Sequence, residues 1–279
     1  MATSKSQHAQ ASADLAKVGQ TVARKYRVLE VLHSSNIGTT FVAEPNEGPP
    51  GTRVAIKIIS EDLSGDHRYR ERFIDEANAA SQVDNKYLVT PNDVGSTEEE
   101  RLYCATNFWP GQTLAKDLDE KGWLPAGHAL RVVRKVLRGI EAAHAAGMTH
   151  GDVTPARVML VSTTNGNRSV RMLGLGIARK DGSAAAKYAA PELLAGYSAS
   201  TATDIYAVGA VLYETLTGVT PQGGSEPPPS PEEFLPEIRG HEELATVVMK
   251  AIDPDPESRI KSASRFVYEI QRALNAMNR

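Results

Sequence analysis

The chain has 279 residues, of which 41% are apolar and 23% are charged, so it is long enough for one large domain or for two lobes that share a cleft. Its formal net charge of −3 gives no electrostatic reason to expect nucleic acid or an anionic membrane as a partner. The single cysteine, Cys104, excludes an internal disulfide, and no apolar stretch reaches the roughly 18 residues of a membrane helix. We therefore expect a cytoplasmic protein that binds neither membrane nor nucleic acid.

The first part of the chain predicts a β-rich region with one helix. Residues 1–24 are polar and carry no apolar segment of the signal-peptide type, so they are interpreted as a flexible N-terminal extension. Beyond them, β-branched or alternating runs predict strands, and Phe73, Ala77 and Ala80 recur at helical spacing. The predicted strands are 26–32, 40–45, 53–59, 87–97 and 101–108, and the predicted helix is 70–83.

The second part of the chain predicts a mainly helical region. Apolar residues from Leu130 to His144 line one face of a helix that ends at Gly147. A hairpin with strands 158–161 and 170–173 follows, turning through Asn165-Gly166. Three more helices are predicted at 204–216, 242–252 and 263–277, whereas 221–236 is rich in Pro, Gly, Ser and Glu and is interpreted as loop alone. A small β-rich half followed by a larger helical half predicts a bilobal α+β protein.

Five sequence motifs occur in a fixed order. They are Val54-Ala55-Ile56-Lys57, Glu76, His150-Gly151-Asp152, Leu173-Gly174-Leu175-Gly176 and Ala190-Pro191-Glu192. This order resembles that of the protein kinase superfamily, in the bacterial Ser/Thr (Hanks-type) form. The resemblance runs from about Tyr26 to the C-terminus. It implies one kinase-like domain over 25–279, with a β-rich N-lobe that carries helix C at 25–108 and a larger, mainly α-helical C-lobe at 109–279.

The resemblance also implies a nucleotide cleft. Lys57 and Glu76 match the ion pair that holds the α- and β-phosphates in active kinases. The alternative is that this pair only fastens the helix to the sheet. Gly38 matches the third glycine of the phosphate-covering loop, whose first two glycines are replaced by His33 and Ser35. The remaining cleft positions are Ala55, Thr106, Asn107 and Trp109.

Two positions that hold magnesium in the family carry unsuitable residues here. The aspartate position of the DFG motif is Gly174, which has no side chain, and the catalytic-loop asparagine position is Arg157, which has no acceptor. Asp152 stands at the catalytic-base position, where it either accepts a hydroxyl proton or only orders the loop. Since a metal supplies several kcal/mol of transition-state stabilisation, these replacements predict the loss of metal-dependent transfer.

Three further residues match structural positions of the family. Asp204 resembles the aspartate that caps the catalytic-loop backbone, and Glu192 and Arg259 match the buried ion pair of the C-lobe. These three residues predict an intact fold.

An intact fold with several catalytic replacements favours a catalytically inactive kinase-like domain, a pseudokinase that is not an enzyme. We expect it to act as a scaffold or allosteric regulator that binds a protein partner, such as an active kinase or a signalling complex. It would require no cofactor or metal, although ATP or ADP could bind without metal. The alternatives are a metal-independent nucleotide sensor and a weak, atypical Ser/Thr protein kinase that uses Asp152.

Overall fold

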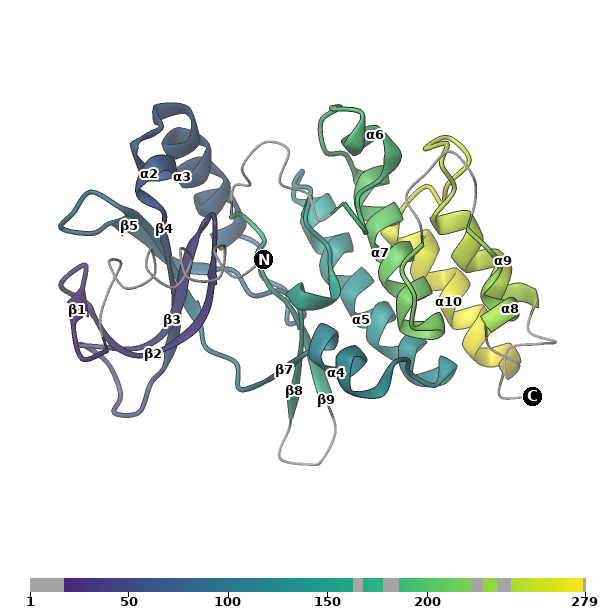
Figure 1. The fold of residues 1–279 in the computed structure, drawn as a ribbon, viewed down its shortest axis with the longest axis horizontal. Coiled ribbons are helices and arrows are strands. Elements are labelled where there is room, and N and C mark those ends of the chain that lie inside the picture. Colours follow the sequence, from purple (N-terminus) through teal and green to yellow (C-terminus); the bar gives the residue numbers. More distant parts are fainter. Residues whose placement is uncertain (1–17, 163–167, 178–185, 222–227, 235–241, 278–279) are drawn as a thin grey trace, which may run out of the picture. The chain divides into compact units, whose positions relative to one another are not determined.

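The computed structural model describes residues 18–162, 168–177, 186–221, 228–234 and 242–277. They divide into two compact units (Figure 1). The first unit holds the described residues up to 82 together with 89–109 and 175–177, and the second holds the rest. Residues 1–17 of the predicted extension and the predicted turn at Asn165-Gly166 lie outside the described residues.

A six-stranded antiparallel sheet forms most of the first unit, in the order β1-β2-β3-β4-β6-β5. Its strands are β1 (Thr21–Val22), β2 (Tyr26–Ser35), β3 (Gly38–Pro45), β4 (Val54–Ile59), β5 (Pro91–Ser96) and β6 (Leu102–Asn107). Strand β1 was not predicted. It lies inside the segment interpreted as a flexible extension, and it joins the sheet because Val22 is buried and pairs with Tyr26.

The two faces of this sheet carry separate apolar clusters, because successive side chains of a strand point in opposite directions. Ile56 and Ile58 of β4 pack on one face with Phe41 of β3. Ile59 packs on the other face, where Phe73 of helix α3 (His67–Ser81) covers the strands. A five-residue helix, α2 (Glu61–Gly65), precedes α3, whose N-terminus is capped by the Asp66 carboxylate.

An acidic side chain joins the start of the sheet to its far edge. Asp93 of β5 accepts hydrogen bonds from the hydroxyls of Tyr26 (2.9 Å) and Tyr103 (2.8 Å) and forms an ion pair with Lys25 (3.0 Å). These donors lower the pKa of Asp93 although burial opposes them, and burial together with Asp93 raises the pKa of both tyrosines. The carboxylate therefore stays ionised and holds β2, β5 and β6 together.

The second unit is mainly helical and carries a small antiparallel sheet. The sheet consists of β7 (Gly111–Thr113), β8 (Val158–Ser162) and β9 (Arg168–Met172). The helices are α4 (Leu114–Lys121), α5 (Ala126–Ala145), the 3₁₀ helix η1 (Pro155–Arg157), α6 (Pro191–Leu194), α7 (Thr201–Thr217), α8 (Pro231–Phe234), α9 (Glu242–Ala251) and α10 (Ala263–Met277). Figure 1 shows α5, α7 and α10 packed as neighbours, with α9 beside α7 and α10.

Helix α7 forms the centre of this unit, as its apolar composition predicts. Thirteen of its residues are buried, so the helix is covered on nearly every side. It begins at a capping box, in which Ser200 and Thr203 each accept a hydrogen bond from the other's backbone N–H, and it ends at Gly218 (φ 77°).

The prediction that 221–236 is loop alone was wrong, because α8 lies within it. Ser230 N–H donates to the Glu233 carboxylate at the start of this helix (3.1 Å), and Pro231 at the first turn fits helical geometry. Phe234 packs edge-on against Tyr213 of α7, with ring centroids 6.3 Å apart, within the range of about 4.5–7 Å that aromatic pairs prefer. Tertiary contact thus stabilises a turn of helix that composition alone does not indicate.

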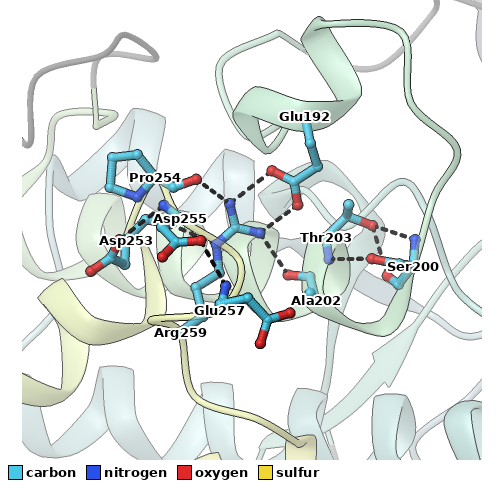
Figure 2. Close-up of polar contacts among 9 residues, drawn as sticks. All are labelled: Glu192, Ser200, Ala202, Thr203, Asp253, Pro254, Asp255, Glu257 and Arg259. Atoms are coloured by element: carbon cyan, nitrogen blue, oxygen red, sulfur yellow. Dashed lines mark hydrogen bonds and ion pairs between the residues drawn. The ribbon is translucent and has the colours of Figure 1, made fainter.

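Arg259 connects three separate segments of the second unit (Figure 2). Its guanidinium forms a two-fold ion pair with Glu192 at 2.5 and 2.8 Å. Its remaining N–H groups donate to the backbone carbonyls of Ala202 (3.2 Å), Asp253 (2.6 Å) and Pro254 (3.0 Å). Every guanidinium donor is therefore satisfied although the residue is 1% exposed.

The predicted fold class is confirmed: a small β-rich lobe with helix C, here α3, and a larger lobe that is mainly α-helical. Within the described part of the chain, no helix combines the length and apolar character needed to cross a membrane.

Candidate functional site

Three of the predicted nucleotide-binding residues lie on one face of the first unit's sheet. Ala55 and Lys57 are two positions apart on β4 and so point to the same face, and Thr106 of β6 pairs directly with Ala55. Cys104 pairs with Lys57 and belongs to the cluster on the α3 face, so all of these side chains share that face. Lys57 is 8% exposed, while Ala55 and Thr106 are half-buried. A buried lysine and two small side chains therefore share one face of the sheet.

Glu76 lies on α3, in the middle of the helix that covers this face. Its carboxylate is 3.8 Å from the Arg72 guanidinium, an (i, i+4) ion pair in which both side chains are partly exposed. Phe73 and Ala77, its neighbours on the helix, are fully buried against the sheet. The predicted Lys57–Glu76 ion pair stays a prediction.

Ile37 anchors the turn between β2 and β3 to the first unit's core. This turn lies at the position of the phosphate-covering loop. The Ile37 side chain is 9% exposed and packs with Ile59, Leu63 and Phe73. Its carbonyl also accepts a hydrogen bond from Ser60 N–H (2.9 Å). Gly38 follows at φ 149°, and a Cβ there would lie 2.1 Å from the Ile58 carbonyl. Gly38 is thus required for close packing against β4, a structural role that the resemblance alone does not reveal.

The hinge positions follow the end of β6. Asn107 is exposed, and its side-chain oxygen accepts a hydrogen bond from Asn92 (2.8 Å). The next N–H, that of Phe108, donates to the Arg53 carbonyl (3.2 Å) and is therefore already bonded within the unit. Trp109 is half-buried.

Asp204 of α7 holds the predicted catalytic loop of the second unit in place. The Asp204 carboxylate accepts hydrogen bonds from the backbone N–H groups of His150 (2.8 Å) and Gly151 (2.7 Å), and its Oδ2 is 2.8 Å from His144 Nε2. Asp204 is 1% exposed, so these bonds are shielded from water. The first turn of α7 therefore fixes the backbone that presents Asp152.

The His150 imidazole reinforces the same loop. Its Nε2 lies 3.1 Å from the Leu173 carbonyl, and its Nδ1 accepts the backbone N–H of Asp152 (3.3 Å). This pattern requires a neutral ring protonated at Nε2. Burial is the largest influence on the ring and lowers the pKa of His150, although Asp204 and Asp152 oppose the change. The ring consequently stays neutral where it links the loop to the segment before Gly174.

Asp152, Arg157 and Gly174 form one contiguous group. Arg157 follows Asp152 through the turn of η1, and its Nη2 donates to Asp152 Oδ2 at 2.8 Å. The backbone N–H of Leu173 donates to the Arg157 carbonyl (2.8 Å), which places Gly174 beneath the arginine. A Cβ on Gly174 would lie 3.1 Å from Arg157 Nη1. A side chain at position 174 would therefore meet the guanidinium at close range, and the arginine would have to shift by a few tenths of an ångström.

These residues do not fit a magnesium ion at this place. Gly174 offers no side-chain oxygen, and Arg157 presents N–H donors and a positive charge. In the part of the chain that the structure describes, no three His, Cys, Asp or Glu side chains gather closely enough to hold a metal ion. We therefore derive no catalytic step through a metal.

Sequence reasoning missed two members of this site. His144 was assigned only to the apolar face of its helix, yet it contacts Asp204 at 2.8 Å. Arg157 was regarded as an unsuitable metal ligand, but its ion pair with Asp152 was not foreseen. A histidine on an apolar helix face just before the His150-Gly151-Asp152 motif was the available signal for the first, and an arginine five residues after the aspartate was the signal for the second.

A sheet unit with a buried lysine and a helical unit with an aspartate in a His-x-Asp loop define the bilobal protein-kinase fold. The chain belongs to this family: the family model described as "Protein kinase domain" matches residues 26–275.

Named relatives agree with this membership. The chain is 30% identical to the serine/threonine-protein kinase pkn3 of Myxococcus xanthus over 91% of its own length and 51% of that protein. It is 28% identical to the serine/threonine-protein kinase PknA of Mycobacterium tuberculosis over 90% of its length and 61% of that protein. The chain thus spans about half to three-fifths of the curated relatives it matches.

A solved structure extends the likeness to three dimensions. The crystal structure of the Mycobacterium tuberculosis PknI kinase domain is 26% identical and covers 93% of this chain and 99% of its own, with a TM-score of 0.79. The predicted resemblance to bacterial Ser/Thr kinases is therefore confirmed.

The comparisons correct one prediction. The replacements at Gly174 and Arg157 led us to expect a protein that is not an enzyme, whereas the relatives are named serine/threonine-protein kinases and the matching structure is a kinase domain. These findings point to an enzyme. The prediction rested on two replaced metal positions, Gly174 and Arg157, whereas the comparisons cover most of the chain.

Proposed function

We propose that this chain is the phosphotransferase domain of a serine/threonine protein kinase in which the Arg157 guanidinium supplies the fixed positive charge that a metal supplies elsewhere in the family. The observation that carries the proposal is the Arg157–Asp152 ion pair at 2.8 Å, in which only Oδ2 of the carboxylate is engaged. The other oxygen, Oδ1, has no hydrogen-bond partner among the described residues. The Asp152 side chain is 17% exposed.

In the proposed reaction, the oxygen of a substrate serine or threonine attacks the γ-phosphorus of ATP. The bond between this phosphorus and the β,γ-bridging oxygen breaks, ADP leaves, and the hydroxyl proton passes to Asp152 Oδ1. Arg157 holds the carboxylate in one orientation and contributes positive charge to the loop. Because the transferring phosphoryl group is anionic, a fixed guanidinium stabilises the charge that develops; arginine residues in comparable roles contribute about 10³–10⁵-fold to rate.

Nucleotide binding is assigned to the first unit. The proposed contacts are the Lys57 ammonium for phosphate oxygens and the sheet face at Ala55 and Thr106 for the adenine. Their common face on the sheet supports this assignment. A lysine at 8% exposure retains a strong electrostatic preference for an anion, because its charge is only weakly screened by water.

The test is transfer of radiolabelled γ-phosphate to the protein itself and to a generic Ser/Thr substrate, in magnesium and in EDTA. We expect slow transfer that persists in EDTA, is abolished in Asp152→Asn and falls at least about 10³-fold in Arg157→Gln. Asp84→Asn is the matched control, because it removes an exposed carboxylate elsewhere. Transfer no greater in the native protein than in Asp152→Asn, in both buffers, would refute the proposal.

A second candidate function is metal-independent nucleotide sensing, which the sheet face around Lys57 supports without requiring Asp152. It predicts that ATP raises the melting temperature in EDTA, that Lys57→Met removes this rise, and that no Asp152-dependent transfer occurs. Lys116→Met, a change at an exposed lysine, is the control. An ATP-dependent rise accompanied by Asp152-dependent transfer selects the first function over the second.

The expected protein partner, scaffold role and cytoplasmic location stay predictions. Recovery of a specific partner by pull-down from the native host would support the first two.

A further inference from the structure

A strongly basic pocket lies in the second unit, between the N-terminal half of α5 and strand β9. It has a volume of about 660 Å³, within the roughly 300–1,000 Å³ typical of small-ligand sites. His128, Arg131 and Lys135 line it from one face of α5, and Arg168 lines it from β9. The spacing of three and four residues along α5 places these basic side chains together. None of the residues discussed in the proposed phosphotransfer chemistry lines this pocket.

The acidic side chain that pairs with the lining residue Arg168 is shared with a second cation. Asp117 of α4 is fully buried and forms ion pairs with Arg168 (2.6 Å) and Lys121 (2.8 Å). Burial acts to raise its pKa, but hydrogen bonds from Lys121, Gln112 and Arg168 outweigh burial and lower the pKa. One carboxylate is thus shared between two cations. Lys135 donates to the backbone carbonyl of Arg168 (3.0 Å), and no acidic side chain forms an ion pair with Arg131 or Lys135 among the described residues. The pocket therefore keeps an excess of positive charge.

The excess positive charge of the pocket affects the pKa of His128. Its pKa is lowered first by burial and then by the positive charges of Arg131, Arg168 and Lys121, which Asp117 only partly offsets. The ring is therefore neutral near pH 7 and can accept or donate a hydrogen bond. An anion placed in the pocket would reverse the electrostatic influence on the ring.

The rest of the lining is apolar or belongs to a helix start. Pro125, Val132 and Val170 contribute the apolar part, and Pro125 is also the N-cap residue of α5. No side chain caps this helix, so the positive end of a 20-residue helix faces the same region. Apolar surface beside concentrated positive charge fits an anion attached to a short aliphatic group better than a bare inorganic ion.

We propose that this pocket is a second ligand site, which binds the phosphate group of a phosphomonoester such as a phosphorylated serine or threonine side chain. A dianionic phosphate carries about −1.5 to −2 charge at pH 7 and accepts several hydrogen bonds, which matches three cationic side chains and a neutral histidine. A carboxylate would supply one negative charge and two acceptor oxygens. The site is independent of phosphotransfer, so either proposal can fail without the other.

The experiment follows the His128 ring by NMR in the isotopically labelled chain, with His128→Gln used to assign its signal. N-acetyl-phosphothreonine amide, inorganic phosphate and N-acetyl-threonine amide are added in turn, in EDTA and at constant ionic strength. We expect the two phosphates to cause a saturable shift and to raise the pKa of His128, and the threonine amide to do neither. Tighter binding of phosphothreonine than of inorganic phosphate identifies a phosphorylated side chain as the source, and equal binding assigns recognition to the phosphate alone.

Two variants make the assignment specific. Arg131→Gln with Lys135→Gln removes two charge-assisted contacts and should weaken phosphothreonine binding at least about tenfold. Arg138→Gln lies on the same helix but pairs with Glu141 outside the pocket, so binding should be unchanged. Melting temperatures verify that each variant is folded, and Arg131→Gln alone serves if the double variant is not. The proposal is overturned by the absence of a saturable His128 shift, by unchanged affinity in the folded Arg131 variants, or by an equal response to the unphosphorylated amide.

Discussion

The group formed by Asp152, Arg157 and Gly174 predicts how metal-dependent catalysis could be restored. The double substitution Gly174→Asp with Arg157→Asn places a carboxylate and an amide oxygen where the family holds magnesium. Each single substitution should fail. A side chain at position 174 starts 3.1 Å from the Arg157 guanidinium, so a lone carboxylate there would pair with the arginine rather than with a cation.

The magnitude follows from the value of the metal. Stabilisation of the transition state by ~5 kcal/mol corresponds to a rate increase of more than ~10³-fold. We expect the double variant to transfer phosphate at least about 10³-fold faster with magnesium than in EDTA, and each single variant to change by less than about tenfold. The two substitutions should therefore be non-additive, with a coupling of at least about 1.4 kcal/mol, a factor of ten.

The double variant also has a structural cost. Gly174 has φ 95°, a left-handed conformation that disfavours any other residue by about 1–2 kcal/mol. In a chain of this size that cost lowers the melting temperature by roughly 2–8 °C. Gly174→Ala with Arg157→Asn is the matched control, because it carries the same backbone strain without a metal ligand.

The assay is single-turnover transfer from radiolabelled ATP, with magnesium titrated against EDTA. A double variant that melts cooperatively and binds ATP, yet shows less than a tenfold response to magnesium, would refute the assignment of positions 157 and 174.

Three further predictions concern stability and reactivity. Arg259→Met strips Glu192 and three backbone carbonyls of their donor and should lower the free energy of unfolding by about 3–5 kcal/mol in urea titrations, whereas the exposed Lys261→Met should change it by less than about 1 kcal/mol. The folded state holds His150 neutral, so the unfolded chain binds more protons below about pH 6.5. The free energy of unfolding should therefore fall on acidification by up to ~1.4 kcal/mol per pH unit because of this residue. An equal dependence of the free energy of unfolding on pH in His150→Gln would contradict that account. Burial raises the pKa of Cys104 to about 12, so iodoacetamide at pH 8 should modify the folded chain about 10³-fold more slowly than the urea-unfolded chain, and comparable rates would show that the thiol is accessible.

Elements governed by local pattern could be predicted closely from the sequence. The helix at 204–216 was predicted from its apolar composition and from Gly218, and α7 runs from Thr201 to Thr217. The last two helices were predicted within one residue of their observed ends, because their apolar spacing is regular. The kinase resemblance also gave Asp204 its place beside the catalytic loop, since the family fixes that position.

Features that depend on side-chain geometry or distant partners could not be predicted. The Arg157–Asp152 ion pair depends on the rotamer of a long side chain and on the space left by Gly174, seventeen positions later in the sequence. Helix α8 depends on Tyr213 of a different helix. The replacement of metal ligands was visible in the sequence, but the positive charge that fills the same place was visible only in the folded loop.

The environment of Arg259 has a consequence for local opening of the second unit. A single guanidinium joins the short helix at Glu192, the start of α7 at Ala202 and the turn at 253–254, so none of these segments can separate without breaking bonds of the other two. Their backbone amides should therefore exchange with solvent as one cooperative group, at a rate set by opening of the whole group rather than by fraying of each segment. A displacement of the chain around Glu192 would then be transmitted to the turn at 253–254 by one side chain.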